Sequence, residues 1–155
     1  MTAFVGRSYG PYRYEVGAEK IREFALAIGG GVPSSIYPPA FPADLPRDYW
    51  DDAYAKEHHG ALVAPPTFCV TFAIKPFVAC TLDPELGLNL LLLVHGEQEL
   101  ETLEPVRAGD VMVTVGTLAE HYEKNGKEFV VVRTVSTNQH GREAVRGAWT
   151  AVIRK

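Results

Sequence analysis

The sequence predicts an α+β fold in which an antiparallel sheet wraps around one long buried helix. The second half of this 155-residue chain is predicted to be an antiparallel sheet of four long strands, and residues 111–122 alternate as in a strand with one buried face. Ahead of them, residues 64–77 are apolar on most sides of a helix, and such a helix must be enclosed by other structure. A sheet that curls around this helix buries both apolar surfaces at once.

A short strand and an amphipathic helix open the chain. Residues 12–16 alternate as a strand and end at Gly17, and over 18–28 the spacing of apolar residues changes to that of a helix. Gly29 follows as a common helix terminator. The predicted apolar face of this helix holds Ile21, Phe24, Ala25 and Ile28.

Residues 29–47 are predicted to form a Pro/Gly-rich loop. Three consecutive glycines and the prolines that follow them are incompatible with a helix or a strand. Loops of this length in compact domains commonly act as lids, binding loops or partner contacts. The alternative is a stiff surface excursion held down by its two aromatic residues, Tyr37 and Phe41.

A short helix is expected next, with Asp48 as its N-cap and an end near His59. Asp51 and Asp52 fall in its first turn, where the helix dipole favours negative charge. His58 and His59 are adjacent and point to different faces of the helix, so they cannot chelate one metal ion as an i, i+4 pair could. We therefore expect no metal site.

The segment 64–77 is predicted to be the buried helix. Pro65 and Pro66 fit a helix start, because the first helical N–H groups have no partner within the helix. The content of β-branched residues would favour a strand, but the length and the double proline favour a helix. Its polar residues recur every four positions and form one stripe, made of Thr67, Thr71 and Lys75.

Four strands complete the chain. Asn125-Gly126 is the strongest short hairpin signal, and Gly109-Asp110 is typical of a turn. This order of elements is that of the hotdog architecture, in which the exposed back of the sheet normally pairs with a second copy. The predicted strands span 88–100, 111–122, 129–137 and 144–153.

Polar residues at 95–98 interrupt the first of these strands. They indicate a bulge at Gly96, a neighbour that approaches the backbone closely, or a site. A structural role of His95 in the sheet or at a subunit junction is the favoured interpretation, and contact with a ligand is the alternative.

Composition excludes several classes of protein. The net charge of −4 and the absence of a basic run argue against nucleic acid or anionic lipid as a partner. Cys69 and Cys80 form neither a C-x-x-C pair nor a zinc spacing, which indicates reduced thiols. The chain lacks the pattern of a signal peptide, an apolar run long enough to span a membrane, and nucleotide-binding motifs. We expect one cytoplasmic domain over 1–155 that needs no cofactor.

Several stretches resemble the MaoC-like dehydratases, in particular their N-terminal, FAS1-like dehydratase type of hotdog domain. The resemblance covers nearly the whole chain and implies work on acyl thioesters of coenzyme A or acyl carrier protein. The implied reaction is (R)-specific hydration of a trans-2-enoyl group, or dehydration of a 3-hydroxyacyl group. The stretches that carry it include 14–17, 60–68, 93–100 and 105–110.

The chain departs from the catalytic members where the resemblance places their chemistry. Those members carry D-x-N-P-x-H after the first helix, and its Asp and His act as the acid–base pair. Here residues 29–37 read GGGVPSSIY and contain neither. The catalytic members also have a glycine at the start of the buried helix, whose N–H polarises the thioester carbonyl. The matching residue here is Pro66, which has no N–H.

Three functions follow as hypotheses. In the first, the chain is the non-catalytic subunit of a hydratase and acts as a hydro-lyase only together with a catalytic MaoC-like partner. The residues expected to border the acyl channel are Tyr37, Phe41, Pro66, Thr67, Thr71 and His95. The second is a self-sufficient homodimeric hydratase that uses substitutes such as Asp51, Asp52, His58 or His59. The third is a non-enzymatic acyl-CoA-binding protein. A hotdog thioesterase is a weaker alternative.

Overall fold

The structure is a computed structural model that describes residues 2–29 and 41–154. The described residues group into two compact units. The first unit holds residues 2–14, 70–104 and 112–154, and the second holds 15–29, 41–69 and 105–111.

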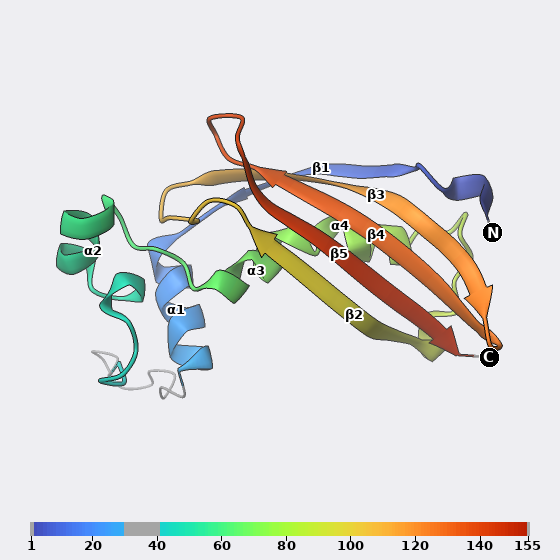
Figure 1. The fold of residues 1–155 in the computed structure, drawn as a ribbon, viewed down its shortest axis with the longest axis horizontal. Helices are drawn as coiled ribbons and strands as arrows, with labels where there is room; N and C mark the ends of the chain where they lie inside the picture. The colour runs from blue at the N-terminus through green and yellow to red at the C-terminus, as the bar shows by residue number, and fades with distance from the viewer. Residues whose placement is uncertain (1, 30–40, 155) are drawn as a thin grey trace. The chain divides into compact units, whose positions relative to one another are not determined.

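The first unit contains a five-stranded sheet in the order β1-β3-β4-β5-β2. The strands lie side by side in Figure 1, and β3, β4, β5 and β2 pair antiparallel in that order, which confirms the predicted α+β class and its four long strands. β1 and β2 are the edge strands, and Pro11 in β1 lies where a missing ladder N–H is tolerated. The strands span Ser8–Glu15 (β1), Leu93–Thr102 (β2), Val111–Lys124 (β3), Lys127–Thr137 (β4) and Glu143–Arg154 (β5).

The predicted hairpin joins β3 to β4. Asn125 and Gly126 have φ values of 51° and 70°, the left-handed conformations that a two-residue turn of this kind requires. Lys124 and Lys127 pair directly on either side of the turn. The turn therefore fixes the register of the longest strand pair.

The strand predicted from residue 88 begins later, at Leu93. The side chain of Asn89 accepts a hydrogen bond from the N–H of Leu91 and starts a short 3₁₀ turn, Leu90–Leu92. Asparagine side chains that bond the backbone in this way favour turns over strands. The apolar run before β2 is thus a turn, in which Leu91 is exposed.

The predicted buried helix is built from three segments: a 3₁₀ turn Pro66–Cys69 (η3), α3 (Val70–Ala73) and α4 (Lys75–Thr81). The break between α3 and α4 has a clear cause, because Pro76 has no N–H to donate to the preceding turn. In the first unit, α3 and α4 lie against β4 and β5, behind the strands in Figure 1. This side of the sheet is called the helix face below, and the opposite side the outer face.

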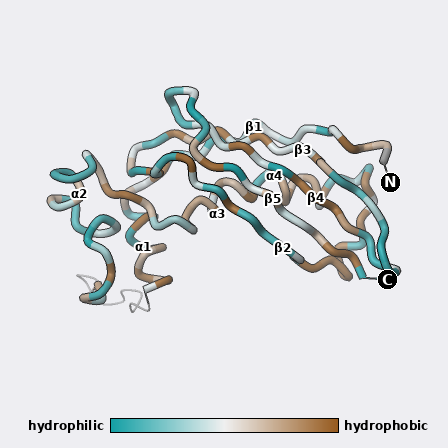
Figure 2. Tube along the Cα trace, viewed as in Figure 1, coloured by the Kyte–Doolittle hydropathy of each residue, from teal (hydrophilic) through white to brown (hydrophobic). Residues whose placement is uncertain are grey.

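Close packing holds α4 to the sheet. A Cβ atom at Gly116 of β3 would lie 2.3 Å from the Cβ of Pro76, so glycine allows the close approach there. On the same helix face, Trp149 of β5 is fully buried, and its indole N–H donates to the hydroxyl of Thr134 at 2.9 Å. Buried and more exposed positions alternate along much of β4 and β5, and both apolar and polar residues occur along these strands (Figure 2).

Both cysteines are buried. Cys69 is 2% exposed and Cys80 is fully buried, and neither is in a disulfide. Burial raises the pKa of the Cys80 thiol, which keeps it protonated. The expectation of reduced core thiols agrees with this arrangement.

The second unit contains α1 (Ala18–Ile28), a 3₁₀ turn Arg47–Tyr49 (η2) and α2 (Asp52–His59). The bounds of α1 are those predicted, and Gly29 is its C-cap, but Ile28 is 54% exposed whereas Leu26 is buried. The expected N-cap Asp48 is wrong. Asp51 takes that role, because its carboxylate accepts a hydrogen bond from the N–H of Tyr54 at 3.1 Å.

None of the helices within residues 2–29 and 41–154 has the length and apolar character needed to cross a membrane.

Candidate functional site

The start of the helix that follows Ala64 offers few free N–H groups. Pro65 and Pro66 have none, and the N–H of Phe68 donates to the carbonyl of Pro65 at 2.8 Å. Pro66 and Thr67 are both exposed. Of the N–H groups at 65–68, only that of Thr67 is left to polarise a substrate carbonyl.

The rest of the predicted polar stripe is partly covered. Thr71 on α3 and Lys75 on α4 are half-buried. In the first unit, the ammonium of Lys75 lies 5.1 Å from the centre of the Tyr14 ring, a cation–π contact. Thr71 stays a predicted channel residue.

His95 lies on the helix face of the sheet, at the edge strand β2. Its ring centre is 5.3 Å from that of Phe77 and 6.0 Å from that of Trp149. The predicted bulge is present, because the register of β2 against β5 shifts between His95 and Glu97. A Cβ at Gly96 would lie 2.6 Å from Val152 Cγ2, so this position also has the predicted close neighbour. The bulge and the close neighbour account for Gly96 in this strand, and the roles of His95 at a subunit junction or in ligand contact stay predictions.

The aromatic residues of the predicted loop fall on both sides of the boundary of the described residues. Tyr37 lies outside them. Phe41 is half-buried and stacks on Trp50, with ring centres 4.9 Å apart.

Three of the substitute catalytic candidates have structural partners. Asp51 caps α2 and pairs with Arg47 at 2.6 Å, and the hydrogen bond from the Tyr54 N–H, with help from Arg47, holds the pKa of Asp51 below its usual value. His58 stacks on Tyr54, with ring centres 4.1 Å apart, and its Nδ1 lies 2.8 Å from the Tyr54 carbonyl oxygen. Asp52 pairs with Arg22.

His59 differs, because it faces a pocket of the second unit. Its Nε2 lies 2.5 Å from Oδ1 of Asp48, and the two side chains are 39% and 29% exposed. The pocket has a volume of about 310 Å³ and is lined by Asp48, Tyr49, His59, Val63, Pro105 and Arg107. We call it the Arg107 pocket.

Main-chain hydrogen bonds tie the walls of the Arg107 pocket together. The N–H of Val63 donates to the carbonyl of Asp48 at 3.0 Å, and Val63 forms a β-bridge with Arg107. The turn after Pro105 is closed by Asp110, whose carboxylate accepts the N–H of Arg107 at 2.8 Å, as predicted for a turn residue. The pocket is therefore a fixed feature of this unit.

Sequence reasoning found His59 but missed Asp48 and Arg107 as its neighbours. The sequence predicts a capping role for Asp48, and it marks 105–110 only as a turn that carries the family resemblance. Only the main-chain pairing of 48, 63 and 107 brings them together.

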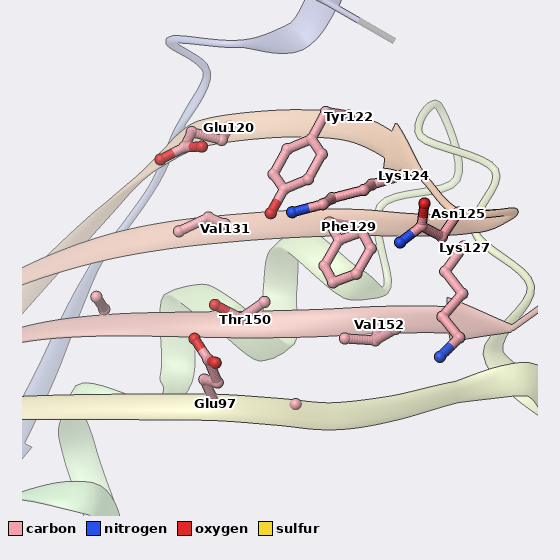
Figure 3. Close-up of a pocket in the computed structure, with 12 residues that line it drawn as sticks. Glu97, Glu120, Tyr122, Lys124, Asn125, Lys127, Phe129, Val131, Thr150 and Val152 are labelled. Atoms are coloured by element: carbon pink, nitrogen blue, oxygen red, sulfur yellow. The ribbon is translucent and has the colours of Figure 1, made fainter.

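A second, larger groove lies on the outer face of the sheet (Figure 3), with a volume of about 560 Å³. Tyr122 and Phe129 stack in it with ring centres 5.0 Å apart and an angle of 3° between the rings. Figure 3 shows Lys124 and Lys127 near the hairpin, with Asn125 beside them. The carboxylates of Glu97 and Glu120 lie farther along the strands.

Within the described residues, no group of three His, Cys, Asp or Glu side chains is placed to hold a metal ion.

Comparison with known proteins decides the family. A family model described as the FAS1-like dehydratase domain region matches residues 3–146. The chain belongs to this family. A protein of Saccharopolyspora erythraea, described as a UPF0336 protein, is 37% identical over 153 residues, which cover 98% of this chain and 90% of the relative.

Solved structures confirm the hotdog fold of MaoC-like dehydratases. One chain of C-terminally truncated HadBC, a 3R-hydroxyacyl-ACP dehydratase complex from Mycobacterium tuberculosis, superposes with a TM-score of 0.73 at 24% identity, covering 97% of this chain and 98% of that chain. A protein described as a MaoC-like dehydratase gives a TM-score of 0.72 at 25% identity; the match covers 99% of this chain but 43% of that one. The same fold therefore occurs in one chain of a complex and as part of a longer chain.

Proposed function

We propose that this chain is the non-catalytic subunit of an (R)-specific enoyl-thioester hydratase, or 3-hydroxyacyl-thioester dehydratase, and that it shapes the acyl channel. The observation that carries the proposal is the helix start at Pro65-Pro66. In a catalytic hotdog subunit, an N–H at this place would stabilise the oxyanion that forms on the thioester carbonyl. The two consecutive prolines have no N–H to donate to that oxyanion, and the N–H of Phe68 already donates to the carbonyl of Pro65.

The sequence supports the same conclusion independently. Residues 29–37 contain no Asp and no His, so the acid–base pair that adds or removes water must come from elsewhere. A second hotdog subunit that carries D-x-N-P-x-H would supply it. The likeness to one chain of HadBC supports this arrangement.

The outer-face groove also supports association with another subunit. Stacked aromatic rings beside charges of both signs are common in protein interfaces, and Tyr122 is 37% exposed. In the first unit, we assign Thr71 and His95 to the acyl channel.

The test is crotonyl-CoA hydration by three preparations: this chain, a MaoC-like partner that contains D-x-N-P-x-H, and the two co-expressed. We expect no turnover by the chain alone and more turnover by the complex than by the partner alone. Equal activity with and without the chain, or no complex at all, would contradict the proposal.

A second candidate, the self-sufficient hydratase, draws support from the Asp48–His59 pair, because a carboxylate beside an imidazole in a pocket is an acid–base arrangement. If the chain alone hydrates crotonyl-CoA, His59→Ala is expected to abolish that activity. His140→Ala, at an exposed turn residue that does not line the pocket, is the control. Full activity of the His59 variant would eliminate this candidate.

A further inference from the structure

Arg107 is distinguished among the described arginines by a buried Nε that has no hydrogen-bond partner. Five other arginines, Arg7, Arg22, Arg47, Arg142 and Arg146, each pair with at least one carboxylate. Arg107 is half-buried and pairs with no carboxylate of the described chain. Its Nε is buried without a hydrogen-bond partner, and its NH1 makes one long bond, 3.4 Å, to the Pro105 carbonyl.

Such a guanidinium is costly unless something satisfies it. A guanidinium has five N–H donors and no acceptor, and a buried donor without a partner costs about 1–3 kcal/mol. The backbone of Arg107 is held in place, because its N–H donates to Asp110 and the residue forms an isolated β-bridge with Val63. The guanidinium with the unmet Nε donor therefore extends from a fixed point of the chain that lines the pocket.

The charge of the Arg107 pocket suits an anion. Asp48 is the carboxylate on the wall, and His59 lies against it at 2.5 Å. The Asp48 carboxylate is thus engaged by His59, whereas no carboxylate of the described residues contacts the Arg107 guanidinium. The planar fork of this guanidinium matches the oxygens of a phosphate.

The size of the pocket sets the class of ligand. About 310 Å³ is at the small end of ligand sites, so a phosphate group with a short linker fits and a long acyl chain does not. Val63, Pro105 and the ring of Tyr49 provide apolar wall for the linker. A phosphate monoester or diester on a slender arm is what both coenzyme A and a carrier protein present, since each holds its thioester on phosphopantetheine.

We propose that the Arg107 pocket binds a phosphate of the thioester's carrier arm, with Arg107 as the anchor and His59 as part of the pocket wall. This inference rests on the proposed function for the identity of the ligand. The Asp48 carboxylate keeps His59 oriented toward the pocket.

Calorimetry with the full chain tests the site without turnover. The probes are pantetheine, 4′-phosphopantetheine, CoA and 3′-dephospho-CoA, so that the contributions of the two kinds of phosphate separate. We expect 4′-phosphopantetheine to bind at least tenfold more tightly than pantetheine if the pocket takes the arm's own phosphate. If it takes the 3′-phosphate, CoA will exceed 3′-dephospho-CoA by a similar factor.

The variants are Arg107→Gln, Arg107→Lys and His59→Gln, with Arg133→Gln as a matched control. Arg133 is an exposed arginine of β4, and its loss should leave Kd unchanged. Arg107→Gln should remove the advantage of the phosphate-bearing probe, about tenfold or more. Arg107→Lys should retain part of it, because the charge remains but the fork does not. Thermal unfolding of each variant shows that the fold is kept.

The outcomes distinguish this proposal from the proposed function. Equal binding of probes with and without phosphate, or equal Kd for the wild type and Arg107→Gln, would overturn the site even if the complex hydrates crotonyl-CoA. Arg107-dependent binding by a chain that adds nothing to a catalytic partner would leave the site in place and overturn the hydratase role.

Discussion

We expect the loss of the hydrogen bond between Trp149 and Thr134 to destabilise the sheet by a measurable amount. Trp149 is fully buried and Thr134 is 2% exposed, and the indole N–H donates to the hydroxyl at 2.9 Å. Gly147 makes room for the bond, because a Cβ there would lie 2.6 Å from Thr134 Oγ1 and 2.7 Å from Trp149 Nε1. Thr134→Val replaces the hydroxyl with a methyl group of similar size, so it removes the acceptor without opening a cavity.

The expected cost is that of a buried N–H left without a partner, about 2 kcal/mol within a range of roughly 1–3 kcal/mol. For a chain of this length, 1 kcal/mol lowers Tm by about 2–4 °C, so Tm should fall by roughly 4–8 °C. Thr117→Val, at an exposed position of β3, is the matched control and should change Tm little.

A double-mutant cycle with Trp149→Phe, measured by urea unfolding, tests the reasoning. Phenylalanine has no N–H, so in this background Thr134→Val should cost close to nothing, and the coupling should be about 1–2 kcal/mol. If Thr134→Val costs the same in both backgrounds, the hydrogen bond is not the source of the effect and the reasoning is refuted.

Three further predictions concern stability and its dependence on pH. Gly116→Ala should destabilise the chain by about 1–3 kcal/mol in chemical unfolding, because the new methyl group would overlap Pro76; Gly17→Ala, where a Cβ would contact nothing, is the control and should cost clearly less. Asp51→Ala should cost about 1 kcal/mol through loss of the cap of α2, whereas Asp51→Asn, which still caps, should cost less; equal costs would contradict the capping role. The hydrogen bond from Arg7 holds the pKa of Asp83 below its usual value, so its stabilising contribution is present above about pH 4 and is lost as pH falls through the folded-state pKa. Asp83→Asn should therefore flatten the loss of stability in acid, while the same change at exposed Asp44 should not.

Local signals predicted the sheet well. The alternation of residues 111–122 and the Asn125-Gly126 turn depend on neighbours in sequence, so this hairpin could be inferred without tertiary information. The bulge at Gly96 was one of three explanations for polar residues in an apolar strand, and the structure shows the bulge together with the close approach of Val152.

Signals that compete at the same place were harder to weigh. Asp48 and Asp51 are both plausible N-caps. Asp48 lies inside the 3₁₀ turn Arg47–Tyr49, so α2 begins only after that turn and Asp51 is its N-cap. Pro76 was read as part of a continuous helix, although its missing N–H divides that helix into α3 and α4.

The pocket could not be read from the sequence for a different reason. Asp48, Val63 and Arg107 meet through main-chain hydrogen bonds between distant segments, and no spacing rule encodes such a meeting. The sequence did place a candidate residue at this pocket, since His59, at the end of α2, lies on its wall.

Because both native thiols are buried, a cysteine introduced on the surface can be labelled selectively to locate the interface with a partner subunit. Cys69 and Cys80 are closed to solvent, and the raised pKa of Cys80 further suppresses its thiolate, the form that reacts with maleimides. A single cysteine introduced at exposed Thr117 would then be labelled selectively without removing either native residue. One fluorophore at that position would report, by energy transfer to a labelled catalytic subunit, whether the outer face of the sheet approaches the partner or turns away from it.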